Sequence, residues 1–440
     1  MDIEEKISLV QRPPTEEIVT ENELRSLFET KTSPKHYIGL EISGKLHLGS
    51  LIIPGFKIND FIKAGIQSNV FLADWHTYIN NKLNNDWDLI DKISQYYEKA
   101  FKFFCPGVNV IFGSDLYKET DDYWKNFIVF SKQITLARTL RSLTIMGRTE
   151  KDALDFSQLL YPSMQSVDIK AMDLDIVHAG LDQRKIHMLV REVFPKLNWK
   201  VPVSVHHHIL PGLAEPSRIT TIPTIPTLTT NNTANEVANI ANKNKSVPVT
   251  GGGGSGTNST SYVANISTAS SNNSDLDTVA SINTTNNPSY DPKDTSTTTT
   301  TISNKSLTFD TSKLESFDDS KIFNKMSKSN PSSSILIHDS QQEIYNKINK
   351  AYCPSGISKD NPVLEIIEYI VFHQYHEIII ERPSKYGGDV SYGTFDQIKK
   401  DYEHNKIHPK DLKLATSRYL DKIIAPVRDY LYNNIPDFKF

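Results

Sequence analysis

The sequence has very little cysteine, no long hydrophobic run and no large net charge. Its only two cysteines, Cys105 and Cys353, are too few for a disulfide framework or a zinc site, which is typical of a reducing compartment. No apolar run is long enough to span a bilayer, and the acidic residues 1–6 lack the apolar core of a signal or transit peptide. These absences predict a cytoplasmic protein with no membrane contact.

The charge balance gives no global sign of nucleic-acid binding. The 440 residues carry a formal net charge of −4, so any contact with RNA must come from local basic patches. Hydrophobic residues make up 38% of the chain and aromatic residues 10%, which is enough for a sizeable core. This length has room for about two or three domains.

Residues 36–50 read as a buried strand that runs into a loop and then into the start of a helix. A helix N-terminus presents unpaired backbone N–H groups and the positive end of the helix dipole, so it attracts phosphate. Gly44 and Gly49 let a phosphate approach the backbone, and His47 adds a side-chain donor. Plain packing of a strand on a helix is the alternative for this pattern taken alone.

Residues 325–329, Lys-Met-Ser-Lys-Ser, form a second polar stretch far downstream. Lys325 and Lys328 supply two ammonium groups, and two hydroxyls lie among them without a hydrophobic period. Such a loop is suited to closing over a polyphosphate. A solvated basic turn is the alternative for the pentapeptide in isolation.

Short apolar runs alternate with longer amphipathic ones across residues 36–213. We expect buried strands at 69–74 and 108–113 and helices near 86–104, 121–143 and 182–194. This alternation predicts an α/β domain with a parallel, doubly wound sheet. Ligands of such sheets bind at the carboxyl ends of the strands near the switch point of strand order, where we place Glu41, Asp74 and Gly113.

Between about residues 214 and 313 the sequence is dominated by Ser, Thr, Asn and Gly. Such a chain buries too little apolar surface to offset the entropy of ordering, which costs ~1 kcal/mol or more per residue, so we predict a disordered segment. A linker between separate domains is the alternative. We favour an insertion, because residues 325–329 belong functionally with the first part of the chain. A long insert is tolerable, since the cost of closing a loop grows only with the logarithm of its length.

Helical periodicity marks residues 21–28 near the start of the chain and returns at 342–348 and 362–367. Two further helices are expected at 392–405 and 409–434, with a loop at 382–388. We therefore divide the chain into a helical segment 1–35, an α/β domain 36–213, a low-complexity insertion 214–313, a loop region 314–335 and a mostly α-helical domain 336–440.

A third polar cluster follows from helical spacing. Tyr161, Gln165 and Asp168 stand at i, i+4 and i+7, which is one face of a helix. Their neighbours are apolar, and polar groups in such a place need partners. We expect this face to line a pocket; a solvated polar stripe is the alternative.

Two stretches occur in a set order: His-x-Gly after the first strand, and Lys-Met-Ser-Lys-Ser near the end of an α/β region. This ordered pair resembles the two signatures of class I aminoacyl-tRNA synthetases. With residues 160–168, 180–187, 350–354 and 407–413, the chain resembles the tyrosyl-tRNA synthetases of archaeal and eukaryotic cytosolic type over about residues 20–213 and 320–437. The resemblance implies a Rossmann-type catalytic domain, an α-helical anticodon-binding domain and a homodimer. The implied reaction uses ATP and Mg²⁺ to convert L-tyrosine to tyrosyl-adenylate and pyrophosphate, then transfers tyrosine to the 3′ end of tRNA(Tyr).

The resemblance also implies a role for each matching residue, and it implies no metal ligand among the side chains. The catalytic residues would be His47, Lys325 and Lys328. Substrate tyrosine would be held by Tyr37 and Asp168 at its hydroxyl and by Tyr161, Gln165 and Gln183 at its amino group. ATP would contact Gly39, His47, Gly49, Asp182, Lys325, Met326, Ser327, Lys328 and Ser329. The tRNA would contact Arg141, Arg184, Tyr386, His408 and Asp411.

One position departs from the family, and two other functions compete. Ser50 replaces the second histidine of the usual His-x-Gly-His, so one phosphate donor is weaker or absent. A tryptophanyl-tRNA synthetase is the nearest alternative, but an indole N–H only donates and fits the Tyr37 and Asp168 pair poorly. A catalytically inactive RNA-binding module is the other; Ser50 favours it, whereas Lys325 and Lys328 oppose it.

Overall fold

The computed structural model of the protein describes residues 1–147, 153–216, 326 and 333–435. These residues all belong to one of the two units into which the chain divides, and residues 221–317 make up the other. The predicted insertion at 214–313 and the loop region at 314–335 lie outside the described residues, apart from 214–216, 326 and 333–335.

A six-stranded sheet forms the centre of the first half of the chain, in the order β1-β6-β5-β2-β3-β4. The strands are β1 (Thr15–Val19), β2 (Lys35–Leu40), β3 (Gln67–Leu72), β4 (Asn109–Phe112), β5 (Ile176–Gly180) and β6 (Val203–His207). Strands β2 to β6 are mutually parallel. From β2 the chain builds outward to β4 and then returns to β5 on the other side of β2. The predicted doubly wound sheet is confirmed, with its switch point at β2.

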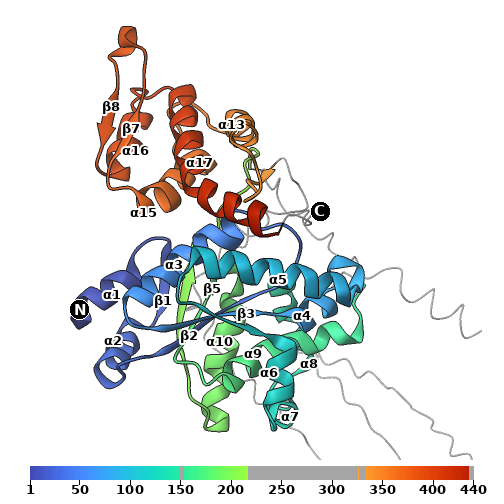
Figure 1. Ribbon diagram of the computed structural model, residues 1–440. Helices are drawn as coiled ribbons and strands as arrows, with labels where there is room; N and C mark the ends of the chain where they lie inside the picture. The colour runs from blue at the N-terminus through green and yellow to red at the C-terminus, as the bar shows by residue number, and fades with distance from the viewer. Residues whose placement is uncertain (148–152, 217–325, 327–332, 436–440) are drawn as a thin grey trace, which may run out of the picture. The chain divides into compact units, whose positions relative to one another are not determined.

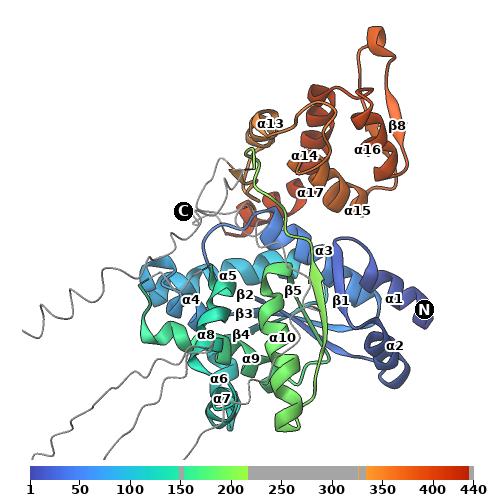
Figure 2. The same cartoon turned by 180° about the vertical axis from the view of Figure 1, so that it is seen from behind.

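Strand β1 was not predicted from the sequence. It pairs antiparallel with β6 at the edge of the sheet, inside the segment 1–35 that periodicity marks as helical. Two helices do flank it, α1 (Ile3–Gln11) and α2 (Glu21–Thr30), each started by a capping box. Figure 2 shows β1 beside α1 and α2. A five-residue strand with two consecutive glutamates shows no clean alternation, so only its pairing with β6 reveals it.

Helices cover both faces of the sheet (Figure 1). The helices of this half are α3 (Ile53–Lys63), α4 (Asp74–Ile79), α5 (Trp87–Phe104), α6 (Gly113–Glu119), α7 (Tyr123–Ser131), α8 (Leu136–Ser142), α9 (Tyr161–Ala171) and α10 (Arg184–Val193). Helices α3 and α5 share a core with Ile38 of β2, whereas α9 and α10 share one with Tyr37. Because side chains alternate along a strand, these two neighbours point to opposite faces. Tyr37 thereby faces α9, which carries the third polar cluster.

The predicted helix at 121–143 is two helices in the structure, α7 and α8. Helix α7 ends at Ser131, and Thr135 then starts α8 by accepting a hydrogen bond from the backbone N–H of Arg138. The sequence pattern missed this break because threonine is tolerated inside a helix as well as at an N-cap.

A fully buried lysine ties the N-terminal segment to helix α3. The Lys57 ammonium donates to the backbone carbonyls of Leu9, Val10 and Arg12 at 2.9 to 3.1 Å and to Asp60 Oδ2 at 3.3 Å. Burial lowers the pKa of Lys57 to about 8, although Asp60 opposes this. The contacts fix the approach of the chain to β1, whose two glutamates lie next to functional candidates described below.

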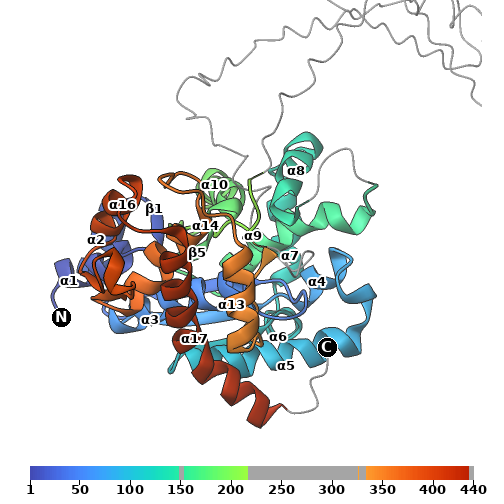
Figure 3. The same cartoon turned by 90° about the horizontal axis from the view of Figure 1, so that it is seen from above.

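The last part of the chain is mostly helical, as predicted. It contains α13 (Gln341–Lys350), α14 (Pro362–Ile366), α15 (Phe372–Gln374), α16 (Phe395–Glu403) and α17 (Pro409–Asn434). Helix α13 lies beside α17 (Figures 1 and 3). A short hairpin of β7 (Ile378–Ile380) and β8 (Val390–Tyr392) was not predicted, and it carries the 382–388 loop. No helix among the described ranges combines the length and the apolar character that crossing a bilayer requires.

Candidate active site

A cavity of about 640 Å³ opens where the parallel strands end, at the switch point of the sheet. Its wall includes residues at or just after the carboxyl ends of β2, β3, β5 and β6, together with part of α9. All the predicted catalytic, tyrosine and ATP residues that the structure describes line it: Tyr37, Gly39, His47, Gly49, Tyr161, Gln165, Asp168, Asp182, Gln183 and Met326. The other predicted residues of these groups, Lys325, Ser327, Lys328 and Ser329, lie outside the described residues.

One end of the cavity holds a buried carboxyl group among phenols. Asp168 is 1% exposed, and its Oδ1 accepts a hydrogen bond from the hydroxyl of Tyr123 at 2.7 Å. Its Oδ2 lies 3.5 Å from Nε2 of the buried His76. Burial raises the pKa of Asp168 well above its usual range, and the hydroxyl of Tyr123 opposes that rise.

Tyr37 adds a second polar group at this end of the cavity. Its side chain is 2% exposed, and burial together with the negative charge of Asp168 raises its pKa far above the usual range. The phenol therefore keeps its proton at neutral pH. Asp168 and Tyr37 together offer an acceptor and a donor to a hydroxyl group inside the cavity.

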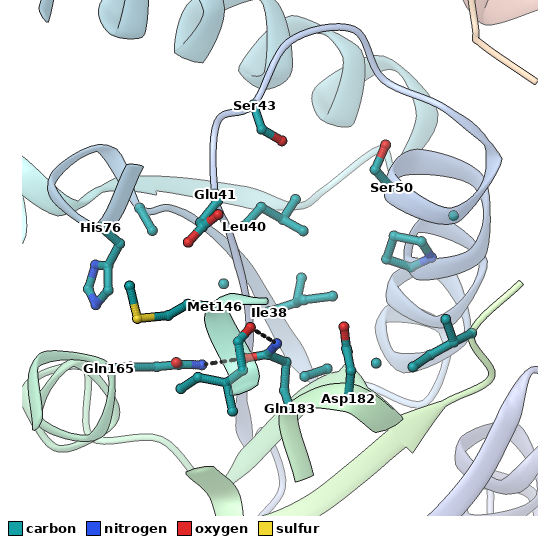
Figure 4. Close-up of a pocket in the computed structure, with 18 of the residues that line it drawn as sticks. Ile38, Leu40, Glu41, Ser43, Ser50, His76, Met146, Gln165, Asp182 and Gln183 are labelled. Atoms are coloured by element: carbon teal, nitrogen blue, oxygen red, sulfur yellow. Dashed lines mark hydrogen bonds between the residues drawn. The ribbon is translucent and has the colours of Figure 1, made fainter. Parts of the chain in front are cut away.

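The cavity wall also holds two hydrogen-bonded pairs, one of a phenol and a carboxylate and one of two carboxamides. The hydroxyl of Tyr161 donates to Glu41 Oε1 at 2.8 Å, and Nε2 of Gln165 donates to Oε1 of Gln183 at 3.3 Å. Nε2 of Gln183 in turn donates to the backbone carbonyl of Ile145 at 2.9 Å. Figure 4 shows Glu41, Gln165 and Gln183 around the same space. The arrangement is suited to an ammonium group, because it concentrates oxygen acceptors beside a carboxylate.

His47 caps the first turn after the loop that follows β2. This turn, Leu48–Ile52, is π-helical and leads into α3. The backbone N–H of Gly49 donates to Nδ1 of His47 at 3.1 Å. In the neutral ring the proton therefore sits on Nε2, which remains a donor. The ring lies on the cavity wall, and its contact with a phosphate stays a prediction.

Ser50, the departure from the family pattern, completes the same cap. Its Oγ accepts a hydrogen bond from the backbone N–H of His47 at 2.9 Å, so the two residues form a reciprocal capping box. Ser50 also lines the cavity (Figure 4). The substitution thus supports the conformation of His47 from a position on the cavity wall.

The chain before residues 327–332 is attached to the segment after β6, and the chain after them is attached to the first signature. Met326 is 5% exposed, lines the cavity and donates its backbone N–H to the carbonyl of Leu210 at 2.8 Å. Further on, Ile337 donates to the carbonyl of Leu46 at 2.9 Å, and Leu48 donates to the carbonyl of Ile335 at 3.1 Å. Met326 of the second predicted phosphate stretch therefore lines the same cavity as His47 of the first, about 280 residues earlier in the sequence.

The predicted tRNA residues are described, and none of them lines the cavity. Arg141 is exposed on α8, and Nε of Arg184 donates to both oxygens of Glu17 on β1 at 2.9 and 3.0 Å. Tyr386 is 63% exposed in the β7–β8 loop. His408 caps α17, where its Nδ1 accepts from the N–H of Lys410, and Asp411 lies in the first helical turn.

Arg382 links the two predicted anticodon stretches. Its guanidinium donates to the carbonyl of Gly388 at the end of the Tyr386 loop and to the carbonyl of Lys406 just before His408, each at 2.9 Å. One side chain thereby holds both stretches.

Two of the three residues expected at the ligand edge of the sheet do not line the cavity. Glu41 does, but Asp74 is occupied by accepting hydrogen bonds from the backbone N–H and hydroxyl of Ser114. A side chain at Gly113 would come within 2.5 Å of Asp74, so this glycine permits that contact. Asp74 and Gly113 do follow the carboxyl ends of β3 and β4, as expected, but the carboxylate of Asp74 is used for a contact between the starts of α4 and α6 and does not line the cavity.

Several cavity residues were not singled out as site candidates by their sequence pattern. His76, Lys82, His207 and His208 all line the wall. None belongs to a motif with helical spacing. His207 and His208 stand at the carboxyl end of β6, and that position in a parallel sheet is the one signal that would have found them.

His208 forms a bridge between two carboxylates. Its Nδ1 bonds to Glu16 on β1 and its Nε2 lies 2.8 Å from Oε2 of Glu365 on α14. Burial disfavours the charged ring, but these hydrogen bonds outweigh it and raise the pKa of His208 to about 9. The charged ring also stacks on Tyr369 with 3.8 Å between ring centroids.

This bridge predicts a pH-dependent contribution to stability. Because the folded pKa is raised above the unfolded value, the contribution is fully present below about pH 6.5 and lost as pH rises through 9. We expect His208→Gln to lower the free energy of unfolding by up to about 3 kcal/mol below pH 6.5 and by much less above pH 9. Urea unfolding of the wild-type and variant proteins at several pH values tests this. Taking the difference between their free energies of unfolding cancels the contribution of other titrating groups. A pH-independent difference would contradict the bridge.

Comparison with known proteins places the chain in a family. The model for tRNA synthetases class I (W and Y) matches residues 29–218 and 302–425. The chain therefore belongs to the class I aminoacyl-tRNA synthetases, in the group specific for tryptophan and tyrosine, and is an aminoacyl-tRNA ligase.

Within this group the chain is similar to proteins of one specificity. A tyrosine–tRNA ligase of Thermococcus sibiricus is 37% identical over 448 aligned positions, which cover 98% of this chain and 95% of the relative. The crystal structure of a tyrosyl-tRNA synthetase complexed with L-tyrosine from Pyrococcus horikoshii matches with a TM-score of 0.71 at 36% identity, covering 98% and 97% of the two chains. A tryptophanyl-tRNA synthetase of Plasmodium falciparum, at 14% identity and a TM-score of 0.55 over 97% and 86% of the chains, shares the fold alone.

Proposed function

We propose that the protein is a tyrosine–tRNA ligase, which activates L-tyrosine with ATP and transfers it to tRNA(Tyr). The observation that carries the proposal is the pair of Tyr37 and Asp168 on the cavity wall, which offers a donor and an acceptor to a phenolic hydroxyl. The similarity to a tyrosine–tRNA ligase and to a tyrosyl-tRNA synthetase complexed with L-tyrosine supports it. Sites built around a substrate hydroxyl reject the analogue without it by roughly four to five powers of ten.

In the proposed activation step, the carboxylate of tyrosine attacks the α-phosphorus of ATP and pyrophosphate leaves. The amino group of tyrosine is held by Tyr161, Gln165 and Gln183, close to Glu41. His47 donates from Nε2 to a phosphate, and Lys325 and Lys328 neutralise the leaving pyrophosphate. No protein nucleophile takes part, so catalysis rests on positioning and on charge stabilisation.

We propose that Mg²⁺ enters as part of the ATP substrate. The described ranges contain no group of three or more His, Cys, Asp or Glu side chains that could hold a metal ion. Mg²⁺ is commonly bound by substrate phosphates with only one or two carboxylates, so such a cage is not needed. When bound, the ion supplies neutralisation of phosphate charge.

For tRNA we propose two contact regions. Arg141 and Arg184 would hold the acceptor end, and the pairing of Arg184 with Glu17 sets the orientation of that guanidinium. Tyr386, His408 and Asp411 would read the anticodon, where an exposed aromatic ring can stack on a splayed base. Arg382, which holds both stretches, supports their acting as one surface.

We further propose that two copies associate and that the protein works in the cytoplasm. Trp124, Ile128 and Leu136 on α7 and α8 are 44%, 58% and 63% exposed, and exposed apolar groups of this size favour an interface. Both cysteines are free thiols, which suits a reducing compartment. The proposed catalytic domain spans residues 36–213, with the strand of segment 1–35 added to its sheet, and the proposed anticodon-binding domain spans 336–440.

ATP–pyrophosphate exchange with tyrosine, tryptophan and phenylalanine tests the proposal. We expect exchange with tyrosine to exceed that with either other amino acid by at least roughly 10,000-fold in kcat/KM. Preference for tryptophan would replace the proposal with the alternative specificity. Absence of exchange with every amino acid, in folded protein, would instead favour an inactive RNA-binding module.

A further inference from the structure

His207 lies at the carboxyl end of β6, and its side chain lines the active-site cavity. A side-chain carbon at Gly180 would lie 2.8 Å from Oδ1 of Asp182 and 3.5 Å from Nε2 of His207. The two polar atoms therefore face one point above Gly180. Glycine at this position leaves that point open for a ligand. Figure 4 shows Asp182 pointing into the same cavity.

The hydrogen bond on the other side of the ring decides which nitrogen of His207 carries the proton. Nδ1 of His207 lies 2.7 Å from Nε2 of His178, so one of the two must donate. Burial lowers the pKa of His207 to about 3 and that of His178 well below its usual range, so both rings are neutral and each carries one proton.

His178 resolves the choice. Its Nδ1 is buried without a hydrogen-bond partner among the described residues. A buried N–H without a partner is rare in proteins, so we assign the proton of His178 to Nε2, from which it donates to His207. The proton of His207 then lies on Nε2, at the cavity.

We propose that His207 is a binding residue for the ribose of ATP. Its Nε2–H donates to a ribose hydroxyl, and that hydroxyl or its neighbour on the ring donates to Asp182. A donor and a carboxylate facing one point match a hydroxyl, which both accepts and donates. This inference rests on the proposed function and on the role that the family resemblance implies for Asp182 as an ATP contact.

The test compares ATP with 2′-deoxy-ATP and 3′-deoxy-ATP in pyrophosphate exchange. We expect wild-type protein to prefer ATP over at least one analogue. His207→Asn keeps a polar group toward His178 but loses the distal donor, so kcat/KM for ATP should fall about 3- to 10-fold while that for the discriminated analogue stays constant. KM for tyrosine should not change. His207→Gln, which restores an N–H farther along the side chain, should recover part of the preference.

His187→Asn is the matched control. His187 also forms a buried imidazole pair, with 2.9 Å between its Nδ1 and Nε2 of His206, but it does not line the cavity. The control should lower thermal stability and leave the preference for ATP unchanged. If His207→Asn does not fold, His207→Ala takes its place.

Several results would overturn the inference. If the wild-type protein used both deoxynucleotides as efficiently as ATP, that result alone would overturn the inference, and no variant would be needed. Equal losses for ATP and both analogues in His207→Asn would show a structural role only. A wild-type protein that makes no tyrosyl-adenylate would instead contradict the proposed function itself, so the two failures are distinguishable.

Discussion

Replacing Asp168 with asparagine should lower kcat/KM for tyrosine in ATP–pyrophosphate exchange by roughly 100-fold, because a buried acceptor for the substrate hydroxyl is lost and that hydroxyl is left unpaired. In wild-type protein the hydroxyl of Tyr123 donates to Oδ1 of Asp168 at 2.7 Å. In the variant, the single amide oxygen of the asparagine would have to accept this hydrogen bond. The amide nitrogen would then replace Oδ2, which lies 3.5 Å from Nε2 of His76, so this wall of the cavity has a donor in place of an acceptor. The value for phenylalanine should stay constant.

The ratio of the two substrates is the decisive measurement for this variant. Asp175→Asn makes the same change at a second buried aspartate, which accepts hydrogen bonds from Lys31, Lys35 and Lys200 and does not line the cavity. The control should lower stability without changing the ratio of tyrosine to phenylalanine. An unchanged ratio in a folded Asp168→Asn protein would remove Asp168 from the proposed substrate site.

Replacing His47 with asparagine should lower kcat for exchange by roughly 100-fold, because one preorganised donor to a phosphate contributes about 3 kcal/mol in the transition state. The asparagine oxygen can still accept the N–H of Gly49, as Nδ1 of His47 does at 3.1 Å, so the cap should persist. What disappears is the donor at Nε2. KM for tyrosine should therefore remain near the wild-type value.

A second histidine with the same local geometry separates the two steps of the reaction. His408 also caps a helix, and its Nδ1 accepts the N–H of Lys410 at 3.1 Å. His47→Asn should lose exchange, whereas His408→Asn should lose mainly the transfer of tyrosine to tRNA. If both variants lost exchange equally with intact folding, the division into a phosphate site and an anticodon site would be wrong.

Most of the fold follows from local sequence signals. Alternation of apolar runs and amphipathic segments predicted the parallel sheet, and the spacing of Tyr161, Gln165 and Asp168 predicted helix α9. Strand β1 and the β7–β8 hairpin did not follow in this way. They are short and lack a clear alternation, and their pairing partners lie far along the chain or across a turn.

The candidate site was predictable where a motif marks it. The phosphate stretch around His47, the helix face of Asp168 and the Lys-Met-Ser-Lys-Ser stretch each carry a recognisable pattern of residue types. By contrast, Asp74 is of a residue type that is common in active sites, yet its carboxylate accepts a hydrogen bond from Ser114 instead of lining the cavity. His207 has no motif at all, and its place on the cavity wall depends on β6 lying next to β5.

Residue type and spacing were sufficient to determine the chemistry available to this protein, because they decide which groups can donate, accept or carry charge. Only the tertiary structure decided which of these groups share a cavity and which are already paired. The reason is physical: the tautomer of His207, the charge of His208 and the pairing of Asp74 depend on neighbours more than 25 residues away in the chain. Such neighbours become known only when the strands are in register.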